Sequence, residues 1–250
     1  MGARVTSSSV AGLLLAFGSG CHSVHPPRPV DLATGQRNVQ GGLAGWRMPQ
    51  GVWRTVGSVA LDPQNDKAFA VTEGKDVMVN NPTGASVDLL SEFEHGDATV
   101  HVEFNVPKGS NSGVYLQGRY EVQIFDSWGV GRSKSSDCGG IYERWMDNHG
   151  YEGHAPLVNA SKAPGEWQSF DIIFQAPQFD AKGKKIANAR FIRVLHNGVM
   201  VQQNVEVTGP TRSAHFEDER PVGPLMLQGD HGPVAFRNIR ITPVTPVSAR

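Results

Sequence analysis

Short runs of alternating apolar and polar residues, separated by glycine, proline, asparagine and aspartate, are the feature that most limits how this chain can fold. The clearest run lies in DATVHVEFNVPKG, where Val100, Val102, Phe104 and Val106 alternate with His101, Glu103 and Asn105. Side chains on a strand point to opposite faces with a period of two, so this run predicts a half-buried strand. Similar runs recur from about Asp31 onward without helical periodicity, which predicts an all-β domain.

Other segments extend this prediction. GVYLQG, RYEVQIFDS and WQSFDIIFQAP are typical of strands, and the terminal GPLMLQGDHGPVAFRNIRITPV predicts two strands around a polar QGDHG loop. Asn197-Gly198, between two apolar runs, is the strongest short signal for a hairpin. The 29 glycines and 16 prolines suit a chain with many turns. We therefore predict one β-sandwich domain over residues 31–246, with two antiparallel sheets packed face to face.

Three stretches do not read as simple strands. Met146–Glu166 and Thr208–Pro224 are long and rich in loop-forming residues, and Asp62–Ser86 reads as a mixture of loop and strand. Long ordered loops in a compact β domain are usually functional or disordered. Their aromatic and histidine residues favour a functional role for the first two.

Charge excludes some partners. The chain has 23 basic and 24 acidic residues, a net charge of −1 and a pI near 6.8. This balance gives no electrostatic reason to expect nucleic acid or an anionic membrane surface as a partner.

The N-terminus resembles an export signal. VAGLLLAF is apolar but too short to span a bilayer, and the small residues before Cys21 resemble a bacterial lipoprotein cleavage site. We expect a signal peptide over residues 1–21, lipidation of Cys21, a proline-stiffened tether over residues 22–30, and a periplasmic or cell-envelope location. Because Gly18 departs from the usual pattern, an ordinary export signal cut near Gly20 is the alternative. If Cys21 is lipidated, Cys138 has no disulfide partner, and we expect it to be an inert, partly buried thiol.

One strand has an unusual polar side. In NSGVYLQGRYEVQIFDSWG, Tyr120, Val122 and Ile124 share one face, and Arg119, Glu121 and Gln123 share the other. The first face belongs to a core. The second is either a solvated face with a cross-strand ion pair or the floor of a polar site.

Four motifs carry a resemblance to a known family. KGSNSGVYLQGRYEVQIFDSWG, GEWQSFDIIFQAP, ANARFIRVLHNGVMVQQNVEVTGPT and GPLMLQGDHGPVAFRNIRITPV occur in the order of the 3-keto-disaccharide hydrolase domain family, and the likeness runs from about Asp31 to Val244. The resemblance implies a concanavalin-like jelly roll in a secreted bacterial protein. It also implies cleavage of sugars oxidised at C3, by elimination or hydration.

Such chemistry needs a base for the C2 hydrogen, a donor or positive group at the C3 oxygen, and an acid for the leaving oxygen. A divalent cation is a candidate electrophile for the enolate, but its ligands cannot be assigned from the sequence. His149, Glu152 and His154 resemble metal ligands in type, although their spacing matches no established motif.

With this resemblance, we expect Glu121 and His231 to be catalytic. Residues expected to bind substrate are Arg119, Gln123, Asp126, Trp128, Tyr142, Glu143 and Gln228. Asp126 is equally suited to a turn before SWG, and His231, in a glycine-flanked loop with Asp230, has a solvated surface position as its alternative. His101 and Glu103 are either neighbours of Glu121 or solvated.

Two functions remain open at this point. The first is an exported enzyme, a hydrolase or lyase that cleaves 3-keto glycosides. The second is a non-catalytic carbohydrate-binding module on the same fold, because fold alone does not determine function. Both have a carbohydrate as partner, with membrane contact only through the lipid anchor. Neither specifies the oligomeric state.

Overall fold

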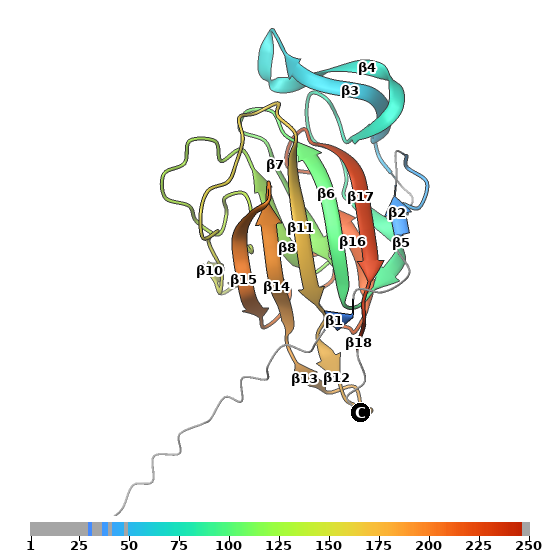
Figure 1. Ribbon diagram of the computed structural model, residues 1–250, viewed down its shortest axis with the longest axis vertical. Coiled ribbons are helices and arrows are strands. Elements are labelled where there is room, and N and C mark those ends of the chain that lie inside the picture. The colour runs from blue at the N-terminus through green and yellow to red at the C-terminus, as the bar shows by residue number, and fades with distance from the viewer. Residues whose placement is uncertain (1–29, 32–36, 40–41, 48–49, 247–250) are drawn as a thin grey trace, which may run out of the picture.

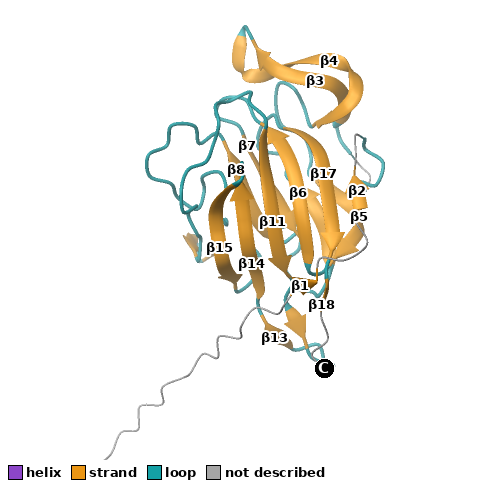
Figure 2. Cartoon of the chain, viewed as in Figure 1, coloured by secondary structure: helices purple, strands orange, loops and turns teal. Residues whose placement is uncertain are grey.

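The computed structural model describes residues 30–31, 37–39, 42–47 and 50–246 (Figure 1). Throughout this part of the chain the regular elements are strands, and the pairs between them are antiparallel (Figure 2). The same part contains no helix that is long and apolar enough to cross a membrane. The all-β prediction is confirmed. The expected signal peptide, Cys21 and most of the tether lie outside the described residues.

The larger sheet forms one layer of the sandwich. Its strands follow one another in the order β15 (Val199–Val207), β14 (Ala189–His196), β11 (Gln168–Gln175), β6 (Ala98–Asn105), β17 (Ala235–Pro243), β4 (Asn65–Val79) and β3 (Arg54–Asp62). The short β2 (Arg37–Val39) also pairs with β17. In Figure 1, β15, β14, β11, β6 and β17 run side by side across the front of the molecule.

The smaller sheet forms the second layer. Its four strands lie in the order β5 (Leu89–His95), β16 (Gly223–Leu227), β7 (Asn111–Leu116) and β8 (Tyr120–Phe125). Three two-stranded ribbons complete the described elements: β1 (Val30–Asp31) with β18 (Thr245–Pro246), β9 (Arg144–Met146) with β10 (His149–Tyr151), and β12 (Gln178–Phe179) with β13 (Lys185–Ala187).

The core lies between the two sheets, as the alternation predicts. On β6, the apolar side chains predicted to face inward are 2% exposed or less. On β8, Tyr120, Val122 and Ile124 are fully buried. The Tyr120 ring packs against Phe174 of β11, with ring centroids 5.5 Å apart, and so joins the two layers. Burying one such large side chain contributes about 1.5–3 kcal/mol.

Turn chemistry fixes the register of the β14–β15 hairpin. Asn197 and Gly198 have φ values of 53° and 80°, the left-handed conformation that a two-residue hairpin turn requires. The predicted hairpin is confirmed, with His196 opposite Val199.

The segment expected to mix loop and strand is more regular than its sequence indicates. β4 is 15 residues long and pairs with β3 in a hairpin that projects beyond the sandwich (Figure 2). Most side chains between Asn65 and Asp76 are exposed, so no apolar alternation marks the strand. The two strands approach closely at Gly57 and Gly74, where an added Cβ on Gly57 would lie 2.4 Å from the Glu73 carbonyl oxygen.

The terminal motif crosses between the layers. β16 lies in the smaller sheet and β17 in the larger one, so the polar loop from Gln228 to Pro233 joins the two sheets. Asn80 fixes this loop, because its side-chain amide donates to the carbonyls of Gly229 and Gly232, at 2.8 and 2.7 Å. The loop thereby carries His231 to the edge of the smaller sheet's outer face.

Candidate functional site

The polar face of β8 is covered. Arg119, Glu121 and Gln123 are each only 2% exposed. Two loops bond to the free edge of the strand: the Tyr142 amide donates to the Glu121 carbonyl at 3.2 Å, and the Thr211 amide donates to the Arg119 carbonyl at 2.9 Å. A solvated face with an exposed ion pair is therefore excluded. The polar face of β8 is instead the floor of a polar site that lies beneath loops.

A pocket of about 200 Å³ opens on this face. It brings together five residues expected from the sequence, namely Glu121, Gln123, Tyr142, Gln228 and His231. Its other lining residues are Asn111, Tyr115, Arg212 and Ser213. Glu121 and His231 thus line one small cavity, although they come from a strand and from a loop more than a hundred residues later. Glu121 is buried, whereas the His231 side chain is 47% exposed, as its surface alternative predicted.

Glu121 fits on the pocket floor because Gly113, on the neighbouring strand β7, has no side chain. A Cβ at Gly113 would lie 2.3 Å from Glu121 Oε1. The pKa of Glu121 is raised to about 8, mainly by burial; a hydrogen bond with Tyr115 opposes this shift, and the negative charges of Asp88 and Asp230 add to it. The Glu121 carboxyl therefore holds its proton at neutral pH and can donate it.

Three amides line the pocket with unsatisfied oxygens. Oδ1 of Asn111 and Oε1 of Gln123 and Gln228 are buried and have no hydrogen-bond partner. A buried acceptor without a partner costs about 1–3 kcal/mol, so a group that supplies donors, such as a sugar hydroxyl or water, would be stabilised here. Gln228 is held in place by the backbone, since its backbone N–H donates to the Gly113 carbonyl at 3.0 Å.

His231 is held by its neighbour. Its Nδ1 is hydrogen-bonded to Oδ1 of Asp230, so Nε2 is the ring nitrogen left for a ligand. The loop itself is anchored by Asp88, whose Oδ1 accepts the Gly229 amide at 2.9 Å. A neutral imidazole that donates from Nδ1 presents a lone pair at Nε2, which is the arrangement of a general base.

The remaining wall comes from the loops over β8. The Arg212 amide donates to the Glu143 carbonyl at 2.8 Å, and the Tyr115 hydroxyl donates to the Arg212 carbonyl at 3.4 Å. The Arg212 guanidinium lies over the Trp145 ring, 3.7 Å from its centroid. Sequence reasoning did not name Arg212, Ser213 or Tyr115 as site residues. The only sequence signal for Arg212 and Ser213 is the expectation that the long Thr208–Pro224 loop is functional.

Four expected substrate-binding residues lie outside this pocket lining. Arg119 pairs with Asp218, Nη2 to Oδ1 at 2.6 Å, and anchors the covering loop. Asp126 accepts the Gly109 amide at 2.9 Å and bonds to the Trp128 amide, which is the turn role left open by the sequence. Trp128 is 61% exposed. The Glu143 carboxyl lies against Gly150, where an added Cβ would come within 2.3 Å of it.

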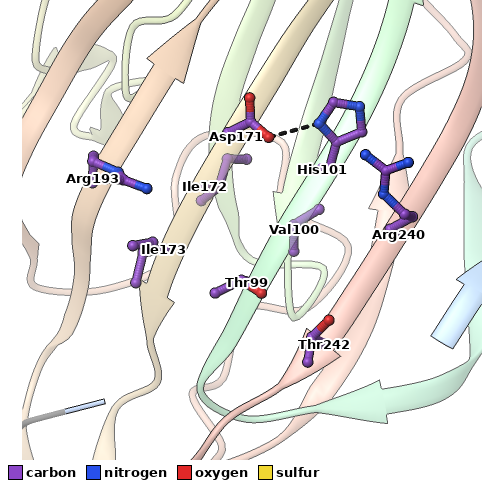
Figure 3. Close-up of a pocket in the computed structure, with 9 residues that line it drawn as sticks. All are labelled: Thr99, Val100, His101, Asp171, Ile172, Ile173, Arg193, Arg240 and Thr242. Atoms are coloured by element: carbon purple, nitrogen blue, oxygen red, sulfur yellow. Dashed lines mark hydrogen bonds and ion pairs between the residues drawn. The ribbon is translucent and has the colours of Figure 1, made fainter. Parts of the chain in front are cut away.

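A second groove lies on the outer face of the larger sheet (Figure 3). There Nδ1 of His101 on β6 bonds to Oδ1 of Asp171 on β11 at 2.7 Å. Figure 3 shows Arg193 and Arg240 on either side of this pair. Because the inward face of β6 is the core, His101 and Glu103 point away from the smaller sheet. The idea that they neighbour Glu121 is wrong.

Metal ligands do not gather in one place. Within the described ranges, no three His, Cys, Asp or Glu side chains are grouped so that they could hold a metal ion. Glu152, expected from its type to be a possible ligand, instead bonds to Thr208 and Arg144. Within the pocket, the groups that could contact a cation are the Glu121 carboxyl, the His231 Nε2 and the three amide oxygens.

Cys138 is 1% exposed, and burial raises the pKa of its thiol to about 12, which makes it a poor nucleophile.

Comparison with known proteins identifies the family. The sequence profile of the 3-keto-alpha-glucoside-1,2-lyase-like domain matches residues 38–242. The chain belongs to this family. The resemblance seen in the four motifs is thereby confirmed. No curated protein matches the chain.

Solved structures of similar fold include a candidate glycosyl hydrolase from Parabacteroides distasonis ATCC 8503, with 28% identity, a TM-score of 0.61 and 83% coverage of both chains. Two further candidate glycosyl hydrolases from the same organism are more distant. One has 20% identity and a TM-score of 0.46 and covers 76% of this chain and 98% of its own. The other has 15% identity and a TM-score of 0.48 and covers 81% and 90%. The first similarity supports the jelly-roll fold.

Proposed function

We propose that this protein cleaves the glycosidic bond of 3-keto glycosides by elimination. The family that it belongs to is named for a 3-keto-alpha-glucoside lyase, which supplies the substrate class. The observation that carries the proposal is that Glu121 and His231 line one small pocket, where burial raises the pKa of the Glu121 carboxyl and Asp230 orients the His231 imidazole.

A 3-keto group makes the C2 hydrogen acidic. His231 Nε2 removes this proton, and the electron pair of the C2–H bond forms an enolate with the C3 carbonyl. The enolate then collapses to a C1–C2 double bond and expels the C1 oxygen, which takes the proton of Glu121. The products are an unsaturated keto sugar and a free alcohol, and addition of water across the double bond would complete a net hydrolysis.

The other lining residues bind and orient the sugar. Arg212 is the cation of the pocket wall and is suited to stabilise the enolate oxygen at C3. The unsatisfied oxygens of Asn111, Gln123 and Gln228 are suited to accept hydrogen bonds from sugar hydroxyls. Because most of the lining residues are polar, the pocket would hold a sugar mainly through hydrogen bonds.

The test compares a 3-keto disaccharide with its unoxidised parent. Purified protein lacking residues 1–21 is incubated with each sugar, with and without a chelator, and the released sugar is measured. The proposal predicts cleavage of the keto sugar alone, and loss of this cleavage in Glu121→Gln and His231→Ala. Chelator sensitivity would add a metal requirement. Saturable binding of either sugar without cleavage would instead support the carbohydrate-binding module.

A further inference from the structure

The pocket is too small for a whole disaccharide. Its volume of about 200 Å³ is below the roughly 300–1,000 Å³ of cavities that enclose drug-sized ligands. If the keto sugar occupies it, the leaving group must lie outside, against the rim. The rim therefore decides which leaving groups fit.

Trp145 lies beside the pocket wall, because its ring packs against Arg212. One face of its ring is covered by the guanidinium of Arg212, a residue of the pocket wall, at 3.7 Å. The side chain is nevertheless 43% exposed, so much of the ring remains open to solvent. A large aromatic surface that is fixed by one contact and still partly exposed can stack on a flat apolar surface, such as the face of a pyranose ring.

Trp145 is part of an ordered hairpin. Trp145 lies in β9, opposite Gly150 of β10, and the hairpin turn places Asp147 and Asn148 at positive φ. Arg144 fixes the hairpin to the loop over β8, because Nη1 donates to Thr208 Oγ1 at 2.5 Å. Its guanidinium also lies 5.1 Å from the centroid of the Tyr151 ring. These contacts hold the hairpin in place, so little freedom would be lost when a ligand binds.

We propose that Trp145 forms a leaving-group subsite, in which a pyranose ring attached at C1 of the keto sugar stacks on its exposed surface. This inference rests on the proposed function. It assigns to Trp145 the preference for a sugar leaving group over a simple alkyl group.

The test measures binding by isothermal titration calorimetry in the Glu121→Gln background, where no turnover is expected. The ligands are a 3-keto disaccharide and methyl 3-keto-glucoside, which has no second ring. Trp145→Ala should raise the Kd of the disaccharide about tenfold, the size expected for one lost aromatic stack, and leave that of the methyl glycoside unchanged within twofold. Met146→Ala is the matched control, because Met146 is on the same hairpin and is 53% exposed.

Equal weakening of both ligands, no effect of Trp145→Ala, or absence of disaccharide binding would overturn the subsite. Failure of the proposed function would give a different experimental result. It appears as a wild-type protein that does not cleave the 3-keto disaccharide, whatever the binding experiment gives.

Discussion

The two outer faces of the sandwich carry similar residues in different surroundings. On the smaller sheet, Glu121 is buried beneath loops, and the amides beside it have unsatisfied oxygens. On the larger sheet, His101 and Asp171 pair with each other in an open groove (Figure 3). Asp171 already has His101 as its partner, whereas the buried Glu121 carboxyl has a raised pKa and faces a pocket that a ligand can enter. The covering loops, rather than the residue types, make the difference.

The largest expected effect separates the two faces directly. Glu121→Gln removes the proton donor and should lower kcat/KM on a 3-keto disaccharide by about 10²–10⁴-fold. Asp171→Asn, the equivalent change on the open face, should leave kcat/KM within twofold. Steady-state kinetics measure both. A comparable loss in the two variants would mean that the buried face is not the site.

The second effect concerns the space that holds Glu121. Gly113→Ala places a Cβ 2.3 Å from Oε1 and should displace the carboxyl, with a loss in kcat/KM of about 100-fold, as expected when a catalytic group is misplaced by about 1 Å. The flexible end of the side chain can move, so the protein should remain folded by circular dichroism. Gly131→Ala is the control, because nothing lies within 4 Å of its added Cβ. Full activity in Gly113→Ala would contradict the role of Glu121.

The third effect is pH dependence. The pKa of Glu121 is about 8 in the folded protein and near 4.3 in an unfolded chain, so the folded state binds the proton more tightly. The stability that this proton contributes is complete below about pH 4 and is lost as pH rises toward 8. Urea unfolding should therefore show Glu121→Gln equal to wild type near pH 4 and more stable at pH 9.

The pH dependence of catalytic activity should also be set by the proton of Glu121. kcat/KM should fall about tenfold per pH unit above pH 8 as Glu121 loses the proton that it donates. Unchanged relative stability across this range, together with a flat rate profile, would show that Glu121 titrates normally.

The smallest effect concerns the covering loop. Asp218→Asn removes the charge that pairs with the buried guanidinium of Arg119. Because the Asp218 side chain is itself 48% exposed, the free energy of unfolding should fall by only about 0.5–1.5 kcal/mol, while KM rises. Asp66→Asn breaks an exposed pair with Lys108 and should leave the free energy of unfolding nearly unchanged. Chemical denaturation compares the two. If Asp218→Asn has no greater effect than Asp66→Asn, the loop is not held by Arg119.

Strand periodicity predicted much of the fold because burial on one face leaves a visible pattern. It gave β6, the β14–β15 hairpin and the two strands around the QGDHG loop. It missed the extent of β4, because that strand's side chains are mostly exposed and no face is apolar.

The site was less predictable. Glu121, Gln123 and Gln228 stood out as polar residues in or beside buried strands, and they line one pocket. Arg212 joins them only because a loop some ninety residues after β8 folds back over it, which no local pattern reports. For the same reason, the sequence could not show that His101 faces away from Glu121, since that depends on which sheet each strand joins.

The central claim is that the pocket breaks a C2–H bond, and a substrate labelled with deuterium at C2 tests it most directly. Mass spectrometry of the keto sugar product after complete cleavage in ordinary water reports whether the label remains, with the product incubated alone as a control for spontaneous exchange. Elimination predicts loss of the deuterium to solvent. Cleavage with the deuterium retained at C2 would indicate direct displacement at C1 and contradict the account.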